Sequence, residues 1–278
     1  MKFDLKAAAK EHLIIVAHRG VSGGNIPCNT MTAYEIALKQ GADMLEVDVD
    51  CSIDGKLFLF HPMMERAHIN RPVIFSLLPY SAVKKFRYVN QDNARTPYGV
   101  CDFDEFLETF NDRCFINIDK FWQNPRKIYD AIVRHGMLDQ VLVKSKPSPK
   151  VYSWLEEVSP ELAYMPIVRN RHDSHEELKR RNINYVGAEI LFETETQPII
   201  DPRFIETLRN EGILLWGNTI VYSMHDCISA GHNDDTAFTV SEDYGWGWVA
   251  DLGLDIIQTD WPMMLIDYLK RTGRYSRQ

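Results

Sequence analysis

The chain has 278 residues, of which 45% are apolar and 25% charged, an ordinary composition for one barrel-sized globular domain. Its net charge of −8 argues against general electrostatic attraction to nucleic acid or to an anionic membrane, so an anionic substrate would need a local source of attraction. Five cysteines, an odd number without CxxC spacing, argue against a disulfide framework and a structural zinc site. A reducing compartment is therefore favoured.

The N-terminal segment predicts a cytoplasmic location. Its first 13 residues carry five charges and no uninterrupted apolar stretch, unlike a secretory signal. No apolar run approaches the roughly 20 residues needed to span a bilayer, so stable membrane insertion is not expected. A periplasmic or extracellular location stays open if a signal was removed ahead of residue 1.

Short apolar runs alternate with amphipathic stretches along the chain. We expect strands at residues 13–17, 44–49, 57–60, 115–118, 141–143, 163–168, 185–191, 213–216 and 255–258. Helices are expected at residues 30–39, 125–135, 149–157, 175–180, 202–210 and 262–270. Such alternation implies parallel strands with right-handed crossovers. Counting 57–60 as an extension of the second unit gives eight units and predicts a (β/α)8 TIM barrel of the α/β class, with an open sheet as the alternative.

Two stretches break this rhythm. Residues 62–113 carry turn residues around two short helical patterns, at 81–86 and 103–110. We interpret them as a small insertion near the barrel mouth, within a single domain that spans residues 1–278. Residues 223–247 are predicted to form a loop or short helix after the seventh strand.

The sequence MLEVDVDCSIDG, at residues 44–55, places three carboxylates on one face of a strand. Side chains at i and i+2 share a face, so Glu46, Asp48 and Asp50 point together. Carboxylates gathered in a barrel mouth repel each other unless a cation lies among them, and an all-oxygen set suits Mg²⁺, Ca²⁺ or Mn²⁺. The alternative is a solvent-facing acidic stripe, which the parallel-sheet context disfavours.

Two histidines are expected near these carboxylates. His18 ends the first strand, and the Asp54-Gly55 turn brings His61 back toward the start of the acidic strand. Such a pair could take a proton from a nucleophile and give one to a leaving group. Arg19 could hold phosphate oxygens bidentately, or form a salt bridge to Glu46 or Asp48.

The motifs that carry these residues resemble the glycerophosphodiester phosphodiesterase family. The resemblance rests on HRG at 18–20, PCNT at 27–30, GADMLEVDVDCSIDGKLFLFH at 41–61, FINIDK at 115–120 and IIQTDWP at 256–262. It implies a TIM barrel that hydrolyses a glycerophosphodiester to an alcohol and glycerol 3-phosphate with one divalent cation. By the same resemblance the metal ligands would be Glu46, Asp48 and Asp119, the catalytic pair His18 and His61, with Arg19 on the phosphate.

The chain departs from the family pattern at three places. Cys28 replaces a glutamate, Pro62 replaces the aspartate after the second histidine, and the third acidic residue is Asp119 without a lysine two positions on. Strand alternation predicts that Lys120 points away from Asp119 unless the strand bulges. Lys144, in an apolar strand, could supply the missing cation, with Glu189 as its partner or as a further site residue.

The roles of two further residues stay open between chemistry and packing. Trp216 could form an aromatic wall of the substrate site or fill the core. Cys28 could be a nucleophile or soft metal ligand, but packing in the space left by the missing carboxylate is favoured.

The departures also leave alternative functions open. The chain could be a catalytically impaired barrel that binds a phosphorylated ligand, or a phospholipase-type lyase that stops at a cyclic phosphate. Headgroup, metal, the choice between water and an internal hydroxyl as nucleophile, and oligomeric state are not set by the sequence.

Overall fold

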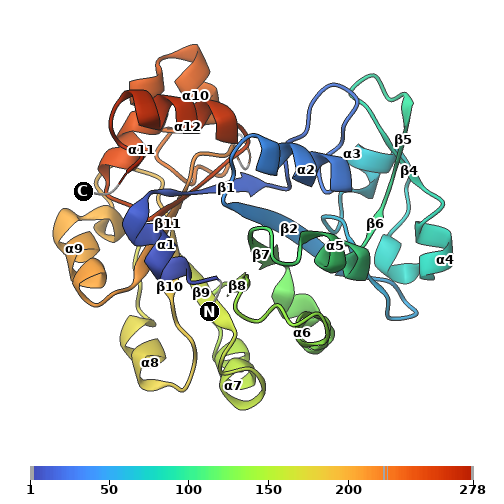
Figure 1. Cartoon of the computed structure of the whole chain (residues 1–278), viewed down its shortest axis with the longest axis horizontal. Helices are drawn as coiled ribbons and strands as arrows, with labels where there is room; N and C mark the ends of the chain where they lie inside the picture. The colour runs from blue at the N-terminus through green and yellow to red at the C-terminus, as the bar shows by residue number, and fades with distance from the viewer. Residues whose placement is uncertain (1–2, 222, 224, 277–278) are drawn as a thin grey trace.

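The computed structural model describes residues 3–221, 223 and 225–276, and its centre is a closed barrel of eight parallel strands (Figure 1). The first strand pairs with both the last strand and the second, and these two pairings close the ring. This confirms the (β/α)8 prediction and excludes the open sheet. The barrel strands are β1 (Ile14–His18), β2 (Met44–Cys51), β7 (Phe115–Asp119), β8 (Val141–Ser145), β9 (Ala163–Arg169), β10 (Gly187–Leu191), β11 (Leu214–Asn218) and β12 (Ile256–Thr259).

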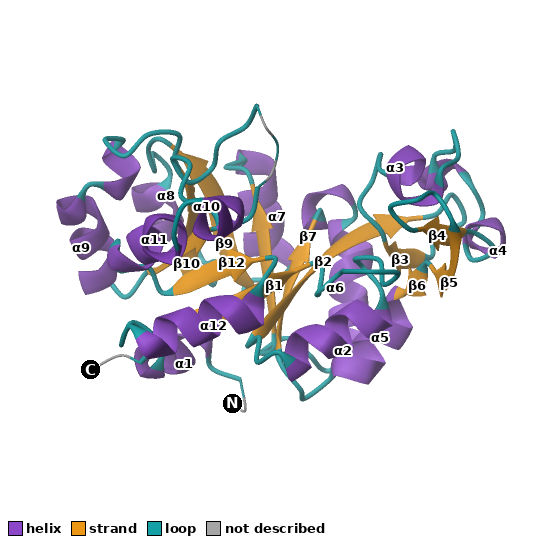
Figure 2. Ribbon diagram, turned by 90° about the horizontal axis from the view of Figure 1, so that it is seen from above, coloured by secondary structure: helices purple, strands orange, loops and turns teal. Residues whose placement is uncertain are grey.

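Helices cover the outside of the barrel, as Figures 1 and 2 show. Several begin with proline in the first turn, where the missing N–H is no loss. The helices around the barrel are α2 (Met31–Lys39), α5 (Phe103–Phe110), α6 (Pro125–Arg134), α7 (Pro149–Val158), α8 (His175–Arg180), α9 (Pro202–Asn210), α10 (Asp234–Thr239), α11 (Trp248–Asp251) and α12 (Pro262–Arg271). Two 3₁₀ turns, η2 (Phe121–Gln123) and η3 (Pro198–Ile200), accompany them.

Strand alternation divides the apolar core in two. In β2, Leu45, Val47 and Val49 face outward into the large core between strands and helices, whereas Met44 faces the barrel interior. The interior core also receives Ala9 of α1 (Leu5–Glu11), a helix that the sequence analysis did not predict. Apolar residues therefore fill the barrel interior at the end covered by α1, and the polar residues of the strands are concentrated toward the carboxyl ends of the strands.

Residues 57–102 form a separate lobe beside the barrel, here called the insertion lobe (Figure 2). Its strand β3 pairs antiparallel with β2 and with β6, and β4 and β5 form a hairpin of their own. A small aromatic core that includes Phe58, Phe60 and Phe75 holds the lobe together. Its elements are β3 (Leu57–Leu59), α3 (Glu65–Ile69), η1 (Phe75–Leu77), α4 (Tyr80–Val83), β4 (Arg87–Val89), β5 (Arg95–Gly99) and β6 (Cys101–Asp102).

The second helical pattern assigned to the insertion lies in the barrel layer instead. Residues 103–110 form α5, and its Phe106 packs edge-on against Tyr34 of α2, with ring centroids 4.9 Å apart. The stretch 223–247, of which residue 224 lies outside the described part, contains α10 and a π-helical turn, η4 (Asp243–Gly247). Among the described residues, no helix combines the length and apolar character that a bilayer crossing requires.

Candidate active site

The carboxyl ends of the barrel strands open into a cavity of about 860 Å³. Ligand sites of TIM barrels lie at this end because the loops after the strands converge there. The lining includes predicted site residues from three strands, His18 of β1, Glu46 of β2 and Asp119 of β7, together with Arg19 and Lys144. The structure therefore brings five of the eight predicted site residues to one cavity.

Three carboxylates meet beside this cavity, and two of them, those of Glu46 and Asp119, line it. Each of Glu46, Asp48 and Asp119 offers an oxygen within 4.8 Å of the others. Burial, reinforced by the neighbouring Asp48 carboxylate, raises the pKa of Glu46 to about 7. Asp50 belongs to the same strand face but not to this group, and burial raises its pKa to about 6.

A left-handed turn directs Arg19 back onto the carboxylates. Its backbone has φ 56°, its N–H donates to the Glu46 carboxylate at 2.9 Å, and its Nε lies 2.8 Å from Asp48 Oδ2. The Asn29 amide also donates to Asp48 Oδ2, at 2.9 Å, while its own oxygen accepts a hydrogen bond from Tyr34 at 2.7 Å. Of the two roles considered for Arg19, the structure shows the salt bridge to Asp48, a carboxylate that Asn29 also contacts.

The prediction that Lys120 points away from Asp119 is wrong. The strand ends at Asp119, and Lys120 adopts a left-handed conformation with φ 60°, so the alternation of side chains no longer applies. Its ammonium lies 2.5 Å from Asp119 and 3.9 Å from Asp48. Burial alone would raise the pKa of Asp119, but Lys120 and Lys144 lower it overall.

The donor set of this cluster fits a hard divalent cation. Asp48 Oδ1 and Asp119 Oδ1 are buried and accept no hydrogen bond from a described residue. Buried carboxylate oxygens without a hydrogen bond are costly unless a cation is bound there, and an oxygen-only set suits Mg²⁺, Ca²⁺ or Mn²⁺. Glu46, Asp48 and Asp119 are thus the residues that could hold such an ion.

His18 is held by a chain of carboxylates that ends deep in the protein. Its Nδ1 lies 2.9 Å from Asp260, whose backbone N–H donates to Asp234 at 2.8 Å. Asp234 in turn accepts hydrogen bonds from Trp246 and Thr259. Burial would lower the pKa of His18, but Asp260 and then Glu46 outweigh it, and the net shift is upward. Asp260 lies in the quoted TDWP motif, yet no pattern in the sequence paired it with His18.

The surroundings of His61 lower its pKa, whereas those of His18 raise its pKa. Its Nδ1 lies 2.8 Å from the carbonyl of Pro62, which can only accept, so Nδ1 carries the proton and Nε2 is free to accept one. Burial is the main reason that the pKa of His61 is lowered, with Arg19 and Lys120 adding to the effect against Asp48. His61 is not among the residues that line the large cavity, although Asp48 is close enough to influence it.

Lys144 is anchored in the barrel interior by Glu189 and Trp216. Its ammonium lies 2.7 Å from Glu189 and 3.7 Å from the centre of the Trp216 ring. Asn218 donates to the other Glu189 oxygen at 2.7 Å and accepts from the Trp216 indole at 3.2 Å. Glu189 is therefore the ion-pair partner of Lys144. Trp216 is fully buried in the interior core and does not line the cavity, so its position agrees with the core alternative.

Cys28 lies near Arg19 but lacks the character of a nucleophile. Burial raises the pKa of its thiol to about 11, and Arg19 only partly opposes this. A thiol that stays protonated at neutral pH is a poor attacking group. The packing interpretation is favoured on this ground.

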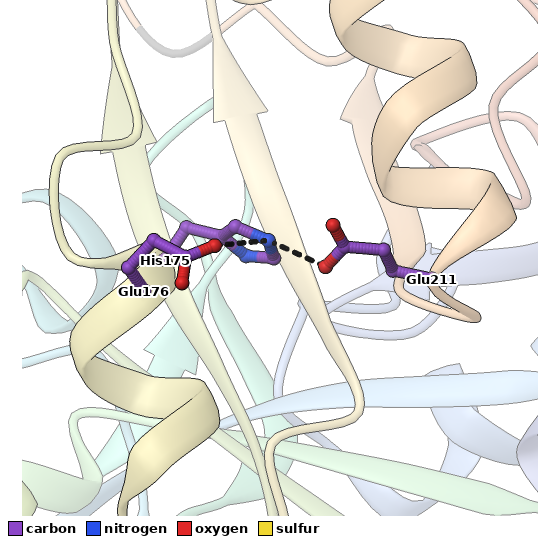
Figure 3. A group of neighbouring side chains, drawn as sticks. All are labelled: His175, Glu176 and Glu211. Atoms are coloured by element: carbon purple, nitrogen blue, oxygen red, sulfur yellow. Dashed lines mark hydrogen bonds and ion pairs between the residues drawn. The ribbon is translucent and has the colours of Figure 1, made fainter.

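A second group of potential metal ligands lies outside the barrel mouth. Figure 3 shows His175 and Glu176 of α8 beside Glu211, with His175 Nε2 2.9 Å from Glu211 and 4.0 Å from Glu176. Lys179 already lies 2.7 Å from Glu211 and 3.2 Å from Glu176. This resident cation neutralises the carboxylates, so the group is a surface ion-pair network.

Comparison with known proteins adds sequence relatives to this geometry. The chain is 53% identical over 143 residues to a glycerophosphodiester phosphodiesterase of Bacillus altitudinis, covering 47% of this chain and 57% of the relative. It is 31% identical over 131 residues, 46% of each chain, to a probable glycerophosphodiester phosphodiesterase 1 of Mycobacterium tuberculosis. Over these stretches the chain is similar to glycerophosphodiester phosphodiesterases. The matches span about half the length of these curated relatives.

Solved structures show that this fold is shared over nearly the whole chain. A glycerophosphoryl diester phosphodiesterase of Parabacteroides distasonis superimposes with a TM-score of 0.78 at 17% identity, covering 96% of this chain and 91% of the other. A phosphodiesterase of Oleispira antarctica, solved with the product sn-glycerol-3-phosphate, gives a TM-score of 0.65 at 17% identity, covering 92% and 96%. Residues 164–269 separately match a family model described as a domain of unknown function, DUF4996.

Proposed function

We propose that the protein is a glycerophosphodiester phosphodiesterase that cleaves a small glycerophosphodiester to an alcohol and glycerol 3-phosphate. The observation that carries the proposal is the buried cluster of Glu46, Asp48 and Asp119, which opens to a cavity beside His18. The sequence relatives support the proposal. The Oleispira antarctica phosphodiesterase, which has the same fold and was solved with the product sn-glycerol-3-phosphate, supports it as well. Such a substrate is an anion, and Arg19, Lys120 and Lys144 provide the local attraction that the net charge of −8 lacks.

The two histidines have environments that suit opposite halves of acid–base catalysis. His61 has a lowered pKa and an unprotonated Nε2, as a general base requires. His18 has a raised pKa and is oriented by Asp260, which suits protonation of the leaving alkoxide. We therefore assign His61 as the base and His18 as the acid.

The remaining residues bind and neutralise the phosphoryl group. Glu46, Asp48 and Asp119 would hold one divalent cation, which when bound supplies Lewis-acid polarisation of the phosphoryl oxygens. Arg19 would shift from Asp48 toward the substrate and neutralise charge that develops on the equatorial oxygens. Lys144, which also lines the cavity, would bind the phosphate. The nucleophile is either water or the 2-hydroxyl of the glycerol moiety.

The direct test is release of glycerol 3-phosphate from diesters with different headgroups, in the presence of Mg²⁺, Ca²⁺ or Mn²⁺. We expect turnover that is lost in the His18→Ala variant. Turnover no higher than that of His18→Ala with every headgroup and metal would contradict the proposal. Ligand-induced thermal stabilisation without product would instead indicate a catalytically impaired phosphate-binding barrel.

The identity of the product tests the choice of nucleophile and the lyase alternative. Phosphorus NMR during turnover distinguishes a phosphomonoester from a cyclic phosphate. Glycerol 3-phosphate as the final product supports the proposed hydrolase, with or without a transient cyclic species. A stable cyclic phosphate would show a lyase.

A further inference from the structure

The insertion lobe contains a second pocket that is separate from the barrel cavity. It has a volume of about 340 Å³ and shares no lining residue with the barrel cavity. Four of its nine lining residues are cationic, Arg71, Lys85, Arg87 and Arg95, and none is acidic. No ion pair joins any of these four side chains to a carboxylate of a described residue. The pocket therefore concentrates positive charge without internal neutralisation.

This charge contrasts with that of the whole protein. Residues 57–102 contain six Lys or Arg and three Asp or Glu, a net charge of 6 − 3 = +3, whereas the chain carries −8. Of the three acidic residues, Glu65 is buried and accepts a hydrogen bond from the Phe75 backbone, and Asp102 pairs with Lys56. These two carboxylates thus do little to offset the pocket's cations. An anion approaching this lobe experiences a local field opposite in sign to the overall charge.

The pocket wall also fixes one guanidinium in place. Arg87 Nη1 donates to the carbonyls of Lys84 and Phe86, at 2.9 and 2.8 Å. Gly99 is the register partner of Arg87 across the β4–β5 hairpin, and a Cβ there would lie 3.1 Å from Nη1. Both of these bonds use Nη1, so, as far as the described residues go, the Nη2 and Nε hydrogens remain for a ligand. An oriented guanidinium loses less freedom on binding than a free side chain.

The remaining cations converge from different elements onto the same space. Arg95 begins β5 and pairs with Val89, the residue two positions after Arg87, and Lys85 lies just before β4. Arg71 reaches the pocket from the turn after α3, and Ile69, Phe86 and Val89 supply apolar surface. Guanidinium and ammonium groups around a small hollow match the several oxygens of a phosphate.

We propose that this pocket is a binding site for a phosphate-bearing anion, distinct from the barrel site. The phosphate could belong to a soluble phosphorylated molecule or to an anionic lipid headgroup. Two apolar side chains near the pocket are exposed: Ile74, three residues after Arg71, and Leu77, one 3₁₀ turn further on. Because apolar side chains beside cations can contact a membrane surface, the test includes a lipid surface as well as a soluble ion.

The soluble arm of the test uses inorganic phosphate and calorimetry. The double variant Arg87→Gln/Arg95→Gln removes two cations from the pocket. The matched control, Arg126→Gln/Arg203→Gln, gives the same net charge by changing exposed arginines of α6 and α9. We expect the wild type and the control to bind one more phosphate per chain than the pocket variant, or to bind it about tenfold more tightly. Equal losses in both variants would show unspecific charge attraction and overturn the proposal.

The lipid arm uses sedimentation with phosphatidylcholine vesicles, with and without phosphatidic acid. Binding that needs phosphatidic acid, and is lost in the pocket variant but not in the control, identifies a headgroup as the ligand. Phosphate binding without vesicle binding identifies a soluble ligand. The absence of both from the wild type overturns the proposal. Circular dichroism and Tm show that each variant is folded, and diester turnover in solution should be unchanged in the pocket variant because it shares no residue with the barrel cavity.

Discussion

Removal of one partner from the buried Lys144–Glu189 pair should strongly destabilise the protein. The two residues are only 3% and 7% exposed, and their charged groups are 2.7 Å apart. Glu189→Gln would leave the ammonium buried with an amide in place of a carboxylate. Loss of one member of a buried pair costs about 3 kcal/mol in unfolding free energy. At this chain length the expected fall in Tm is roughly 5 °C.

Removal of both charges should restore much of this stability. In the double variant Lys144→Met/Glu189→Gln neither side chain of the pair carries a charge, and the methionine can pack on Trp216, whose ring centre lies 3.7 Å from the wild-type ammonium. Replacement of a buried pair by uncharged groups is often neutral, so we expect a value within about 1 kcal/mol of the wild type. The pair would then contribute to substrate binding more than to stability.

Urea unfolding followed by far-UV circular dichroism measures both effects. Glu35→Gln is the matched control, because it breaks an exposed ion pair with Arg113 and should change stability by at most about 1 kcal/mol. The two single substitutions should each be worse than the double. If their effects simply add in the double variant, the two side chains are not coupled and the reasoning fails. The double should also bind glycerol 3-phosphate more weakly than the wild type, as the phosphate role of Lys144 requires.

Three further predictions concern the barrel site. Asp260→Asn should lower the pKa of His18, because it removes the carboxylate that raises it, and the alkaline limb of kcat/KM should move to lower pH while thermal stability changes little. Addition of Mg²⁺, Ca²⁺ or Mn²⁺ to chelator-treated protein should raise its Tm, and this gain should vanish in Glu46→Ala; an equal gain in the variant would contradict the ligand assignment. Cys28→Ala should keep most of the activity, since burial holds the thiol protonated; a variant as inactive as His18→Ala would restore the nucleophile interpretation.

The sequence predicted the barrel well because its signals are periodic and local. Continuous apolar runs mark strands that are buried on both faces, and helices with proline at their first turn were placed correctly, including Pro202–Asn210 with both ends. The α1 helix was missed because its seven residues, rich in Ala and Lys, have only one buried member, Ala9. Aromatic residues occur in both the insertion lobe and α5, and their spacing over residues 57–110 has no periodicity that would mark the boundary between the two.

The side-chain partners in the site were harder to predict because they depend on distance in space rather than in sequence. Asp260 is 242 positions from His18, and Asn218 is 29 positions from Glu189. Alternation along a strand correctly grouped Glu46 and Asp48, but it gave a wrong direction for Lys120 because the strand ends one residue earlier. Pattern rules therefore fail where regular backbone stops, which is where a barrel presents its functional residues.

Each departure from the family pattern has a geometric counterpart in this chain. The aspartate replaced by Pro62 would have oriented a histidine, and here the Pro62 carbonyl itself fixes the His61 tautomer. The lysine missing two positions after Asp119 has a counterpart in Lys120, which the left-handed backbone turns toward the same carboxylate. Where Cys28 replaces a glutamate, Asp48 alone remains within ion-pair distance of Arg19 among the described residues. With one fewer carboxylate to hold it, Arg19 would be freer to move onto a phosphate, so the replacement at Cys28 would favour the proposed substrate binding.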